Sequence, residues 1–494
     1  MERKFTDQEQ IRREHLKKLQ EENRNPYETE IVDRTCTLAE FKKEFEGYDK
    51  ESLHNTEFKS YTLAGRVMIV RQTFGVLKDF SGTCQFYVSK KEVSEDVFKK
   101  FKEIDLGDIV SVVGKPMKTN TGEVTIYVQD INIISKALKV LPEKYHGLVD
   151  EEIRARNRYV DLIVNDESMQ TFVARSLIVR AIRNYMDNDG FFEVETPVLN
   201  PVLGGAAARP FVTHHNALNR EYYLRIATEL PLKKCIVGGF EKVYEIGRIF
   251  RNEGMDATHN PEFTSMEAYV AYTGMQGMMD LTEGVIKHCA KVMNKFECKY
   301  RGFDINLTNP FKRVHMVDLI KEVTGVDFYN VKGDEEAIAI AKQHHIELEK
   351  HQMKYGHVIN AFFENFCEEK LIEPTFVYGH PVEISPLAKK DYSDPRFTKR
   401  FELFIGQKEF ANAFSELNDP IDQYERFEEQ LKEKELGNDE ASEMDMDFVN
   451  ALEYGLPPTG GMGLGIDRLV MLLTEKDTIR DVLLFPHMKD KTNV

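Results

Sequence analysis

An arginine-containing segment in the middle of the chain has residue types that suit the binding of a phosphate. Arg251 lies in the run Arg248–Gly254, and Glu253 follows it closely. An arginine guanidinium can hold a phosphate or a carboxylate through two parallel hydrogen bonds. His259 and Phe263 come downstream, and the aromatic ring would suit stacking on a base. One arginine beside one glutamate is by itself more typical of a surface ion pair, so this prediction depends on the combination.

A second set of side chains with chemical potential lies in the last quarter of the chain. Glu402 and Glu409 offer the hard carboxylate oxygens that Mg²⁺ takes as ligands between phosphates. Asn412, Phe414 and Glu416 are spaced by two residues, so on a β-strand they share one face. Such a face would line a pocket with acidic and aromatic walls. A half-exposed edge strand with salt bridges is the alternative interpretation.

A glycine-rich run, Gly460–Gly465, leads into Arg468. It is not a P-loop, because the pattern GxxxxGK[ST] is missing. It is not a dinucleotide fingerprint either, since the third glycine comes one residue early and no strand is evident before it. We expect a loop whose small residues let the backbone approach a ligand closely, followed by an apolar helix that includes Leu469–Leu473. Arg468 would project near that ligand.

Short β-branched runs predict a small β-barrel ahead of these residues. Four runs separated by turns, with one charged helical stretch between the second and third, are typical of the five-stranded OB-fold, a common platform for nucleic acid. Periodicity alone does not distinguish this fold from another small barrel. The runs are Leu63–Val70, Cys84–Val88, Ile109–Val113 and Val124–Ile134, and the helical stretch is Lys90–Ile104.

The first 55 residues are highly charged and helical in pattern. Ile11, Leu16 and Leu19 form a thin apolar stripe among basic residues. This pattern favours a solvated helix that packs on a neighbour, and a basic arm that contacts nucleic acid is the alternative.

The long region beyond residue 165 has a mixed α and β pattern. Antiparallel strands with helices fit it better than strict β-α-β alternation, so the predicted fold class is α+β. The helical patterns cover Met169–Asn188, Gly277–Phe296 and Met316–Thr324, and the strand-like runs cover Tyr222–Ile226, Lys242–Ile249, Ser265–Ala271 and Phe401–Ile405.

Composition and charge limit the possible classes of protein. The chain has 66 Lys and Arg against 83 Asp and Glu, a net charge of −17. That balance argues against non-specific coating of a polyanion but permits a nucleic acid on a local patch. We expect no membrane span, because no run of about 18 apolar residues exists. The charged N-terminal segment lacks a secretory signal, which predicts a cytoplasmic protein. The six scattered cysteines form no C-x-x-C pair and are expected to be reduced thiols.

Three segments taken together resemble the signature motifs of class II aminoacyl-tRNA synthetases. They are Gly190–Pro197 (GFFEVETP), Phe250–Glu253 (FRNE) with its downstream His259 and Phe263, and Gly463–Arg468 (GLGIDR). With an OB-fold ahead of them, the chain is similar to the subclass of aspartyl, asparaginyl and lysyl enzymes. Further stretches resemble the bacterial lysyl enzymes specifically, and these are Gly204–Phe211, Arg248–Phe263 and Arg400–Pro420. The resemblance covers the chain from about residue 10 to the end.

The resemblance implies a domain order. Residues 1–55 would be a charged helical segment, 56–140 an OB-fold anticodon-binding domain and 141–165 a linker. Residues 166–494 would be a class II catalytic domain, an antiparallel sheet flanked by helices, with a helical insertion around 315–375. The resemblance also implies a homodimer with Pro197 of the first motif at the interface.

Roles for individual residues follow from the same resemblance. Arg251 resembles the arginine that grips the α-phosphate of ATP, and with Arg468 it would be catalytic. The implied ATP-binding residues are Arg251, Glu253, His259, Phe263, Glu402 and Arg468, and the implied Mg²⁺ ligands are Glu402 and Glu409. The implied lysine-binding residues are Gly205, Glu229, Glu267, Tyr269, Asn412, Phe414 and Glu416. The implied anticodon-binding residues are Phe74, Gln85, Tyr87 and Glu123.

The charge of the implied pocket distinguishes between aspartate, asparagine and lysine as the substrate. A site for aspartate should offer Lys or Arg, whereas this pocket offers Glu267 and Glu416. Two carboxylates around an ammonium group pair its charge and accept its hydrogen bonds. Neutral asparagine would leave those carboxylates buried and unpaired, which costs several kcal/mol. Lysine therefore fits best.

We accordingly expect a lysine–tRNA ligase that forms lysyl-adenylate from L-lysine and ATP and transfers lysine to the 3′ end of tRNA(Lys). An aspartyl or asparaginyl ligase of the same subclass is one alternative. A non-catalytic RNA-binding or regulatory paralogue is another, and the presence of Arg251, Glu402, Glu409 and Arg468 argues against it.

Overall fold

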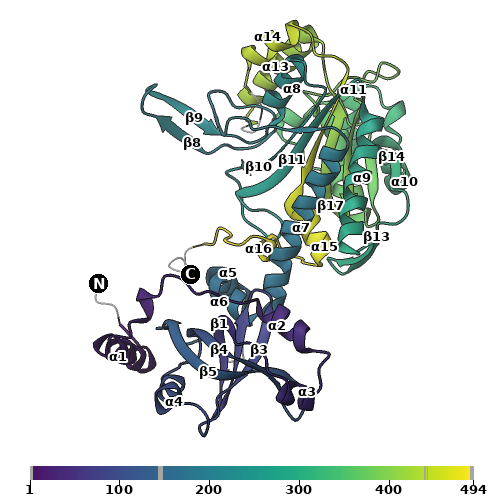
Figure 1. The fold of residues 1–494 in the computed structure, drawn as a ribbon. Coiled ribbons are helices and arrows are strands. Elements are labelled where there is room, and N and C mark those ends of the chain that lie inside the picture. The colour runs from purple at the N-terminus through teal and green to yellow at the C-terminus, as the bar shows by residue number, and fades with distance from the viewer. Residues whose placement is uncertain (1–3, 143–147, 439–440, 442, 490–494) are drawn as a thin grey trace. The chain divides into compact units, whose positions relative to one another are not determined.

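The computed structural model describes residues 4–142, 148–438, 441 and 443–489. The chain forms two compact units, residues 1–149 and 150–494 (Figure 1). Residues 143–147, which belong to the linker predicted over 141–165, lie outside the described residues. No helix within the described residues is long and apolar enough to cross a membrane.

A closed five-stranded barrel forms the centre of the first unit and confirms the predicted OB-type architecture. Its strands alternate in burial, so that every second side chain, such as Leu63 and Val67, packs inside the barrel. The sequence patterns missed the second strand, which has only six residues before a tight turn. The strands are β1 (Tyr61–Val70), β2 (Phe74–Asp79), β3 (Gly82–Tyr87), β4 (Ile109–Lys118) and β5 (Val124–Ser135), and the helix between β3 and β4 is α4 (Glu95–Lys102).

The helices that precede the barrel pack on it. They are α1 (Asp7–Glu21), α2 (Leu38–Phe45) and α3 (Lys50–Asn55), with a 3₁₀ turn at Pro26–Glu28. Arg12 of α1 is 7% exposed, and its guanidinium donates hydrogen bonds to the carbonyl oxygens of Ala137 and Lys139, at 2.9 and 2.8 Å. This arrangement is the solvated helix packed on a neighbour that the apolar stripe favours.

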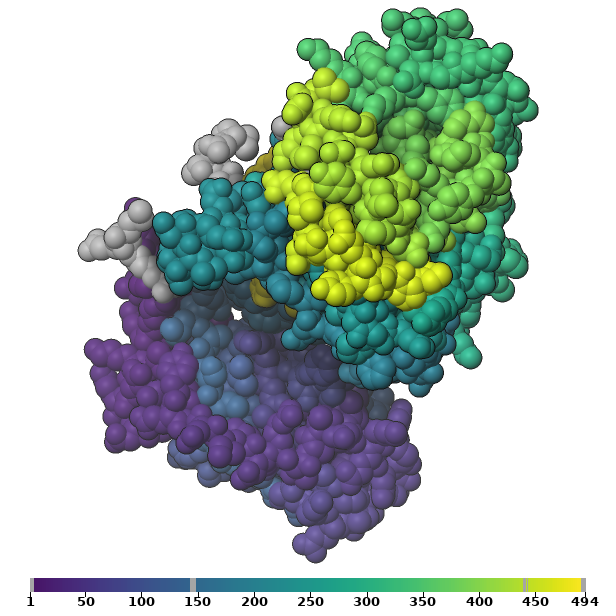
Figure 2. Space-filling view, turned by 90° about the horizontal axis from the view of Figure 1, so that it is seen from above, coloured from purple at the N-terminus to yellow at the C-terminus, as the bar shows by residue number. Residues whose placement is uncertain are grey.

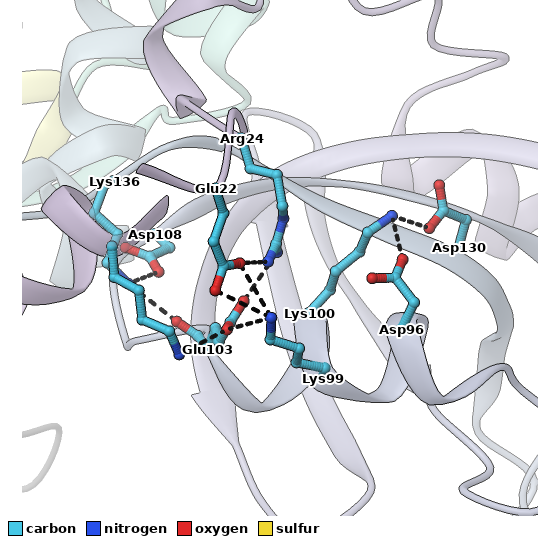
Figure 3. Close-up of polar contacts among 10 residues, drawn as sticks. Glu22, Arg24, Asp96, Lys99, Lys100, Glu103, Asp108, Asp130 and Lys136 are labelled. Carbon is cyan, nitrogen blue, oxygen red and sulfur yellow. Dashed lines mark hydrogen bonds and ion pairs between the residues drawn. The ribbon is translucent and has the colours of Figure 1, made fainter. Parts of the chain in front are cut away.

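Charged contacts hold the same region together (Figure 3). Arg24, just after α1, forms an ion pair of 2.9 Å with Glu103 at the end of α4. Lys136 is buried, and its ammonium lies 2.7 Å from the carboxylate of Asp108. A buried charge of this kind is stable only when it is paired, so these contacts fix the position of the C-terminal end of β5.

An eight-stranded sheet forms the scaffold of the second unit, in the order β14-β15-β16-β17-β18-β11-β10-β6. Neighbouring strands are antiparallel except for the pairs β6–β10 and β14–β15. This sheet confirms the α+β prediction. The strands are β6 (Phe192–Glu193), β10 (Lys242–Phe250), β11 (Glu262–Ala271), β14 (Lys312–His315), β15 (Thr375–Tyr378), β16 (Arg400–Ile405), β17 (Lys408–Ser415) and β18 (Thr459–Gly465).

Helices cover one face of this sheet and bury the main apolar core. Ile182 of α7 (Asp166–Asn188), Ile286 of α9 (Met275–Met293) and Leu472 of α15 (Ile466–Thr474) all belong to this core and are fully buried. Figure 1 shows α7 and α9 running side by side along the sheet. The opposite face is thereby left for polar side chains.

Further helices pack elsewhere on the second unit. Helix α8 (Glu229–Val237) shares an apolar cluster with α13 (Pro420–Glu435) and α14 (Met446–Glu453). Figure 2 shows the surface where the yellow-green α13 and α14 lie next to green residues that precede them in the chain. The remaining helices are α5 (Glu151–Arg156), α6 (Arg158–Val164), α10 (Met316–Thr324), α11 (Gly333–Gln343), α12 (Tyr355–Phe362) and α16 (Ile479–Val482).

Short strands complete the unit. Strands β8 (Val212–His215) and β9 (Arg220–Leu224) form a hairpin that projects from the unit in Figure 1, and β7 (Leu199–Asn200) pairs with β9. Strands β12 (Glu297–Tyr300) and β13 (Phe303–Asn306) form a separate pair.

The glycine run at the C-terminus is a strand, and our expectation of a loop there is wrong. Its residues form β18, which pairs with β11 on one side and β17 on the other. A Cβ atom at Gly461 would lie 2.0 Å from Oε1 of Glu416 and 2.4 Å from the ring of Tyr269. Neighbouring side chains thus occupy the space above the strand, which explains why glycine is needed in a strand that propensity disfavours.

Candidate active site

A cavity of about 590 Å³ lies in the second unit, over the sheet face opposite the main core. The predicted ATP, metal and amino-acid residues converge on it with one exception, Glu416. Those that line it are Gly205, Glu229, Arg251, Glu253, His259, Phe263, Glu267, Tyr269, Glu402, Glu409, Asn412, Phe414 and Arg468.

Strand alternation explains this convergence. On β17, Ala413 belongs to the buried core, while Asn412 and Phe414 on either side of it line the cavity. Successive side chains of a strand point to opposite faces, so a spacing of two places residues on one wall. Strand β17 lies between β16 and β18, and the alternative of an edge strand is therefore wrong.

Arg251 and Phe263 lie against each other at the turn between β10 and β11. The guanidinium carbon of Arg251 is 5.3 Å from the centre of the Phe263 ring. Arg251 directly follows β10 and Phe263 is the second residue of β11, so the antiparallel pair brings them together. A cation and an aromatic face at this distance offer a phosphate ligand and a stacking surface side by side.

His259 and Arg468 meet at another wall of the cavity. Nη2 of Arg468 lies 3.4 Å from Nε2 of His259. The other ring nitrogen of His259, Nδ1, is 2.7 Å from a carboxylate oxygen of Asp256, which orients the ring. Arg468 stands in the first turn of α15 because β18 ends at Gly465. Nε2 of His259 thus accepts a hydrogen bond from the guanidinium, and two side chains from segments far apart in sequence meet in one region.

Glu402 on β16 and Glu409 on β17 form the acidic wall. Burial and the neighbouring carboxylate of Glu402 raise the pKa of Glu409. This repulsion would be relieved by a cation between the two side chains, so the pair fits a divalent ion whose remaining ligands come from phosphates and water. No cluster of three or more His, Cys, Asp or Glu suited to a metal occurs among the residues that the structure describes.

Arg400 is a cavity residue to which sequence reasoning gave no role. Its guanidinium donates hydrogen bonds to Oδ1 of Asn412 at 3.1 Å and to the carbonyl oxygen of Ile384 at 2.7 Å, and it also pairs with Glu402. It therefore connects the acidic wall with the amino-acid pocket. The signal available in the sequence was its spacing of two residues from Glu402, at which side chains of one strand share a face.

The deep end of the cavity is acidic. Oε1 of Glu267 accepts a hydrogen bond from the backbone amide of Thr228 at 3.0 Å, and Oε2 accepts one from the Tyr269 hydroxyl at 3.2 Å. Burial, and then the nearby Glu229 carboxylate, raise the pKa of Glu267 to about 7. A cationic ligand would lower the pKa of Glu267, because an ammonium group favours the charged form of a carboxyl group.

Glu416 differs from the other predicted pocket residues, because it lies behind the cavity wall. It is fully buried and forms an ion pair with Lys233, which also lies 2.6 Å from Oε1 of Glu229. Sequence reasoning missed Lys233. The signal was present, since Lys233 follows Glu229 by four residues, the spacing at which helix side chains meet.

The predicted anticodon residues share one region of the barrel in the first unit. The rings of Phe74 and Tyr87 are 4.6 Å apart, and those of Tyr87 and Tyr127 are 5.6 Å apart. Oε1 of Gln85 accepts a hydrogen bond from Thr125, while Glu123 pairs with Lys42 at 2.9 Å. Neighbouring aromatic rings beside an amide are suited to unstacked bases of single-stranded RNA.

Pro197 lies away from the cavity, in an exposed and apolar part of the second unit. Its neighbours Val198 and Leu199 are 40% and 42% exposed, and Phe192 is 63% exposed. The Phe192 ring contacts that of Phe240, which is 43% exposed, with centres 6.0 Å apart. Clustered exposed apolar residues of this kind mark association surfaces.

Comparisons with known proteins agree with this geometry. A family model described as tRNA synthetases class II (D, K and N) matches residues 150–489, and an OB-fold nucleic acid binding domain matches residues 61–134. The lysine–tRNA ligase of Ureaplasma parvum serovar 3 (strain ATCC 27815) is 64% identical over 492 residues, which cover 100% of both chains. The lysine–tRNA ligase of Mycoplasmoides gallisepticum is 55% identical, and that of Staphylococcus epidermidis (strain ATCC 12228) is 54% identical; each alignment covers 99% of this chain and 100% of the relative.

Proposed function

Since the chain belongs to the class II tRNA synthetases of the aspartyl, lysyl and asparaginyl group, we infer that the cavity activates an amino acid and that this amino acid is lysine. The protein is a lysine–tRNA ligase. It forms lysyl-adenylate from L-lysine and ATP and transfers lysine to the 3′ end of tRNA(Lys). The observation that carries this conclusion is the full-length identity of 54–64% to lysine–tRNA ligases.

The charge of the deep pocket supports the choice of lysine. Glu229 and Glu267 line it, and Glu416 lies directly behind it. The described arginines that line the cavity lie outside this deep pocket. Arg251 and Arg468 lie with the predicted phosphate residues. Arg400 lies between the predicted metal residues and the pocket. An ammonium group is the ligand that buried carboxylates accept at least cost.

The first reaction step requires positioning and charge neutralisation. The lysine carboxylate attacks the α-phosphorus of ATP in line, and pyrophosphate leaves. Arg251 binds the α-phosphate, and Arg468 with His259 receives the outer phosphates. Phe263 stacks on the adenine, and Glu253 accepts a hydrogen bond from its amino group. No side-chain nucleophile is needed, because the substrate supplies the nucleophile.

Glu402 and Glu409 are the residues that would hold the divalent cation, and we assign Mg²⁺ to this place. The adjacency of the two carboxylates supports the assignment, since burial and then the Glu402 carboxylate raise the pKa of Glu409. When bound, the cation neutralises charge on the phosphates. Arg400 holds the Glu402 carboxylate in place through its guanidinium.

The second step uses tRNA, which the barrel recognises at the anticodon. The terminal 3′ hydroxyl attacks the activated carbonyl of the adenylate and releases AMP. Phe74 and Tyr87 stack on anticodon bases, and Gln85 and Glu123 supply hydrogen bonds. Because charged tRNA is used in translation, we place the protein in the cytoplasm.

A homodimer accounts for the exposed apolar surface around Pro197. Phe192, Leu199 and Phe240 are large apolar residues with 63%, 42% and 43% exposure. Burial of such residues in an isologous contact stabilises association by about 25 cal/mol per Å² of apolar surface. The expected partner is a second copy of the chain.

The experiment that tests the function is ATP–pyrophosphate exchange with each of the twenty amino acids in the presence of Mg²⁺. Lysine should drive exchange far above every other amino acid. Exchange driven by aspartate or asparagine would establish the alternative ligase. Absence of exchange with all twenty would favour a non-catalytic paralogue.

A further inference from the structure

Lys233 is a lysine of the chain itself that lies among the groups expected to bind the substrate lysine. Its side chain has no exposed surface. The ammonium lies 2.6 Å from Oε1 of Glu229 and forms a second ion pair with Glu416. The rings of Phe414 and Phe448 lie 5.4 and 5.6 Å from it. A protein cation thus shares the acids and one aromatic wall with the substrate site.

The surroundings keep Lys233 charged. Burial acts to lower its pKa, but the carboxylates of Glu229 and Glu416 outweigh this effect and the pKa is raised. The pKa of Glu416 is raised well above its ordinary value, because burial and the carboxyl groups of Glu229 and Glu267 outweigh the opposing effect of Lys233. Because a buried charge is stable only beside its counter-charge, the ammonium is a permanent part of the empty pocket.

Three carboxyl groups surround the deep end of the cavity, those of Glu229 and Glu267, which line it, and that of Glu416, which lies behind its wall with the ammonium of Lys233. When a cationic ligand favours the charged form of all three carboxyl groups, three negative charges and one positive charge leave two negative charges. Free L-lysine has two ammonium groups, and its carboxylate is directed to Arg251 by the proposed function. The pocket and the two ammonium groups therefore neutralise each other only when Lys233 is present.

The hydrogen bonds are consistent with this count. Glu416 pairs with Lys233 through Oε2, while its other oxygen, Oε1, is buried and receives no hydrogen bond from the described residues. A buried acceptor without a donor is costly, so a donor that arrives with the ligand is expected to approach Oε1. Gly461 leaves the space beside this oxygen, where a Cβ would lie only 2.0 Å away.

We propose that Lys233 is a specificity-determining residue of the lysine site. It acts as an internal counter-ion that cancels one pocket carboxylate and holds Glu229 and Glu416 in position for a substrate with two ammonium groups. The inference rests on the proposed function and deepens it. Lys233 acts through the two acids and is a positioning residue, not a group that contacts the reacting atoms.

The test replaces Lys233 by Met, which retains length and apolar packing but removes the charge. We measure lysine-dependent ATP–pyrophosphate exchange for the unaltered protein, Lys233→Met and Lys234→Met. Lys234 is the matched control, because its side chain is 31% exposed and pairs with Asp447 outside the pocket. In Lys233→Met the KM for lysine should rise at least about tenfold, while kcat and the KM for ATP stay within about twofold.

Two results would overturn the proposal. One is a lysine KM in Lys233→Met equal to that of Lys234→Met. The other is a parallel rise of the lysine and ATP KM values, which a purely structural role would produce. If the unaltered protein shows no lysine-dependent exchange, the proposed function fails instead, so the two failures are distinguishable.

A second measurement does not depend on the variant folding. In the unaltered protein labelled with ¹⁵N-lysine, the buried paired ammonium groups of Lys233 and of Lys136 in the first unit should give slowly exchanging NH₃⁺ resonances, whereas solvent-exposed lysines exchange too fast to be seen. The Lys233 resonance is identified as the one that a Lys136→Met variant retains. This resonance should be present without substrate, persist when L-lysine is added, and be retained in Lys234→Met. Its absence in the substrate-free protein, or its loss on addition of lysine, would contradict a permanent counter-ion.

Discussion

The ionisation of Glu267 should make the KM for lysine depend on pH. Its pKa is raised to about 7 by burial and by the neighbouring Glu229. Below that pH the carboxyl group is mostly neutral and attracts an ammonium weakly, and above it the carboxylate is charged. The side-chain ammonium of lysine stays protonated throughout, since its pKa is about 10.4. We therefore expect the KM for lysine to fall as pH rises from about 6 to about 8.

The measurement is the lysine KM in the exchange assay across this range. The KM for ATP, recorded with the same samples, is the internal control and should change much less. A lysine KM that stays flat or rises with pH would mean that Glu267 is already ionised in the empty pocket or does not contact the substrate.

At this scale the sequence was most informative where a residue matched a family motif. Arg251, Glu253, His259 and Phe263 could be named because the motif fixes both their types and their spacing. Lys233 was missed although its spacing of four residues from Glu229 was visible, because its second ion pair, with Glu416, joins residues far apart in the chain. A contact between residues far apart in the chain cannot be read from the local sequence pattern.

Strand β18 offers a test at the scale of the element. In Gly461→Ala the added methyl group would lie 2.0 Å from Oε1 of Glu416 and 2.4 Å from the Tyr269 ring. These buried groups must shift, so we expect a loss of about 1–3 kcal/mol in the free energy of unfolding and a raised lysine KM. Thermal unfolding and exchange kinetics measure the two effects.

The matched control is Gly463→Ala on the same strand. The nearest atom to a Cβ at Gly463 is 3.8 Å away, which is an ordinary van der Waals contact. Its effect on stability should be clearly smaller than that of Gly461→Ala. Equal destabilisation would show that strand propensity, not the crowded pocket, determines the cost.

The aromatic pair on β2 and β3 separates RNA binding from amino-acid activation. Tyr87→Ala removes one ring of the pair with Phe74, whose centres are 4.6 Å apart. A stacked base contributes about 1–3 kcal/mol, so the KM for tRNA in aminoacylation should rise about tenfold or more while lysine-dependent exchange without tRNA stays unchanged. Phe80→Ala is the control, since Phe80 is 78% exposed at the turn between the same strands. An unchanged tRNA KM in Tyr87→Ala would remove this residue from the RNA site.

Elements were predictable where their periodicity was long. The helix pattern at Met169–Asn188 corresponds to α7, and the strand run at Lys242–Ile249 corresponds to β10. Strand β2 was missed because its six residues follow closely on β1 and lead into a tight turn. The glycines of β18 were misinterpreted because glycine disfavours strands, and only the pocket above them explains their presence.

At the scale of the whole molecule, the apolar surface around Pro197 predicts a dimer. Light scattering coupled to size exclusion should give twice the chain mass of 57.2 kDa. Phe192→Asp places a charge at a residue with 63% exposure in this surface and should shift the mass toward that of one chain. Tyr454→Asp, at a residue with 89% exposure, is the control and should leave the mass unchanged. A single-chain mass for the unaltered protein would contradict the dimer.

The general architecture was accessible from sequence because both units repeat simple patterns. Short alternating runs predicted the barrel, and the mixture of helices and antiparallel strands predicted the α+β class. The order of strands in the large sheet was not accessible, because β18 pairs with β11 across almost two hundred residues of intervening chain. Such long-range pairing is set by packing and not by local preference.

The position of β18 also has a consequence for synthesis on the ribosome. The barrel is complete once the chain has passed Ser135, whereas the large sheet lacks the strand between β11 and β17 until Gly465 has been added. A nascent or prematurely terminated polypeptide that stops before Thr459 has neither this strand nor Arg468. We therefore expect such fragments to fold the barrel but not to form the adenylate, so that adenylate formation would be restricted to chains that are nearly finished.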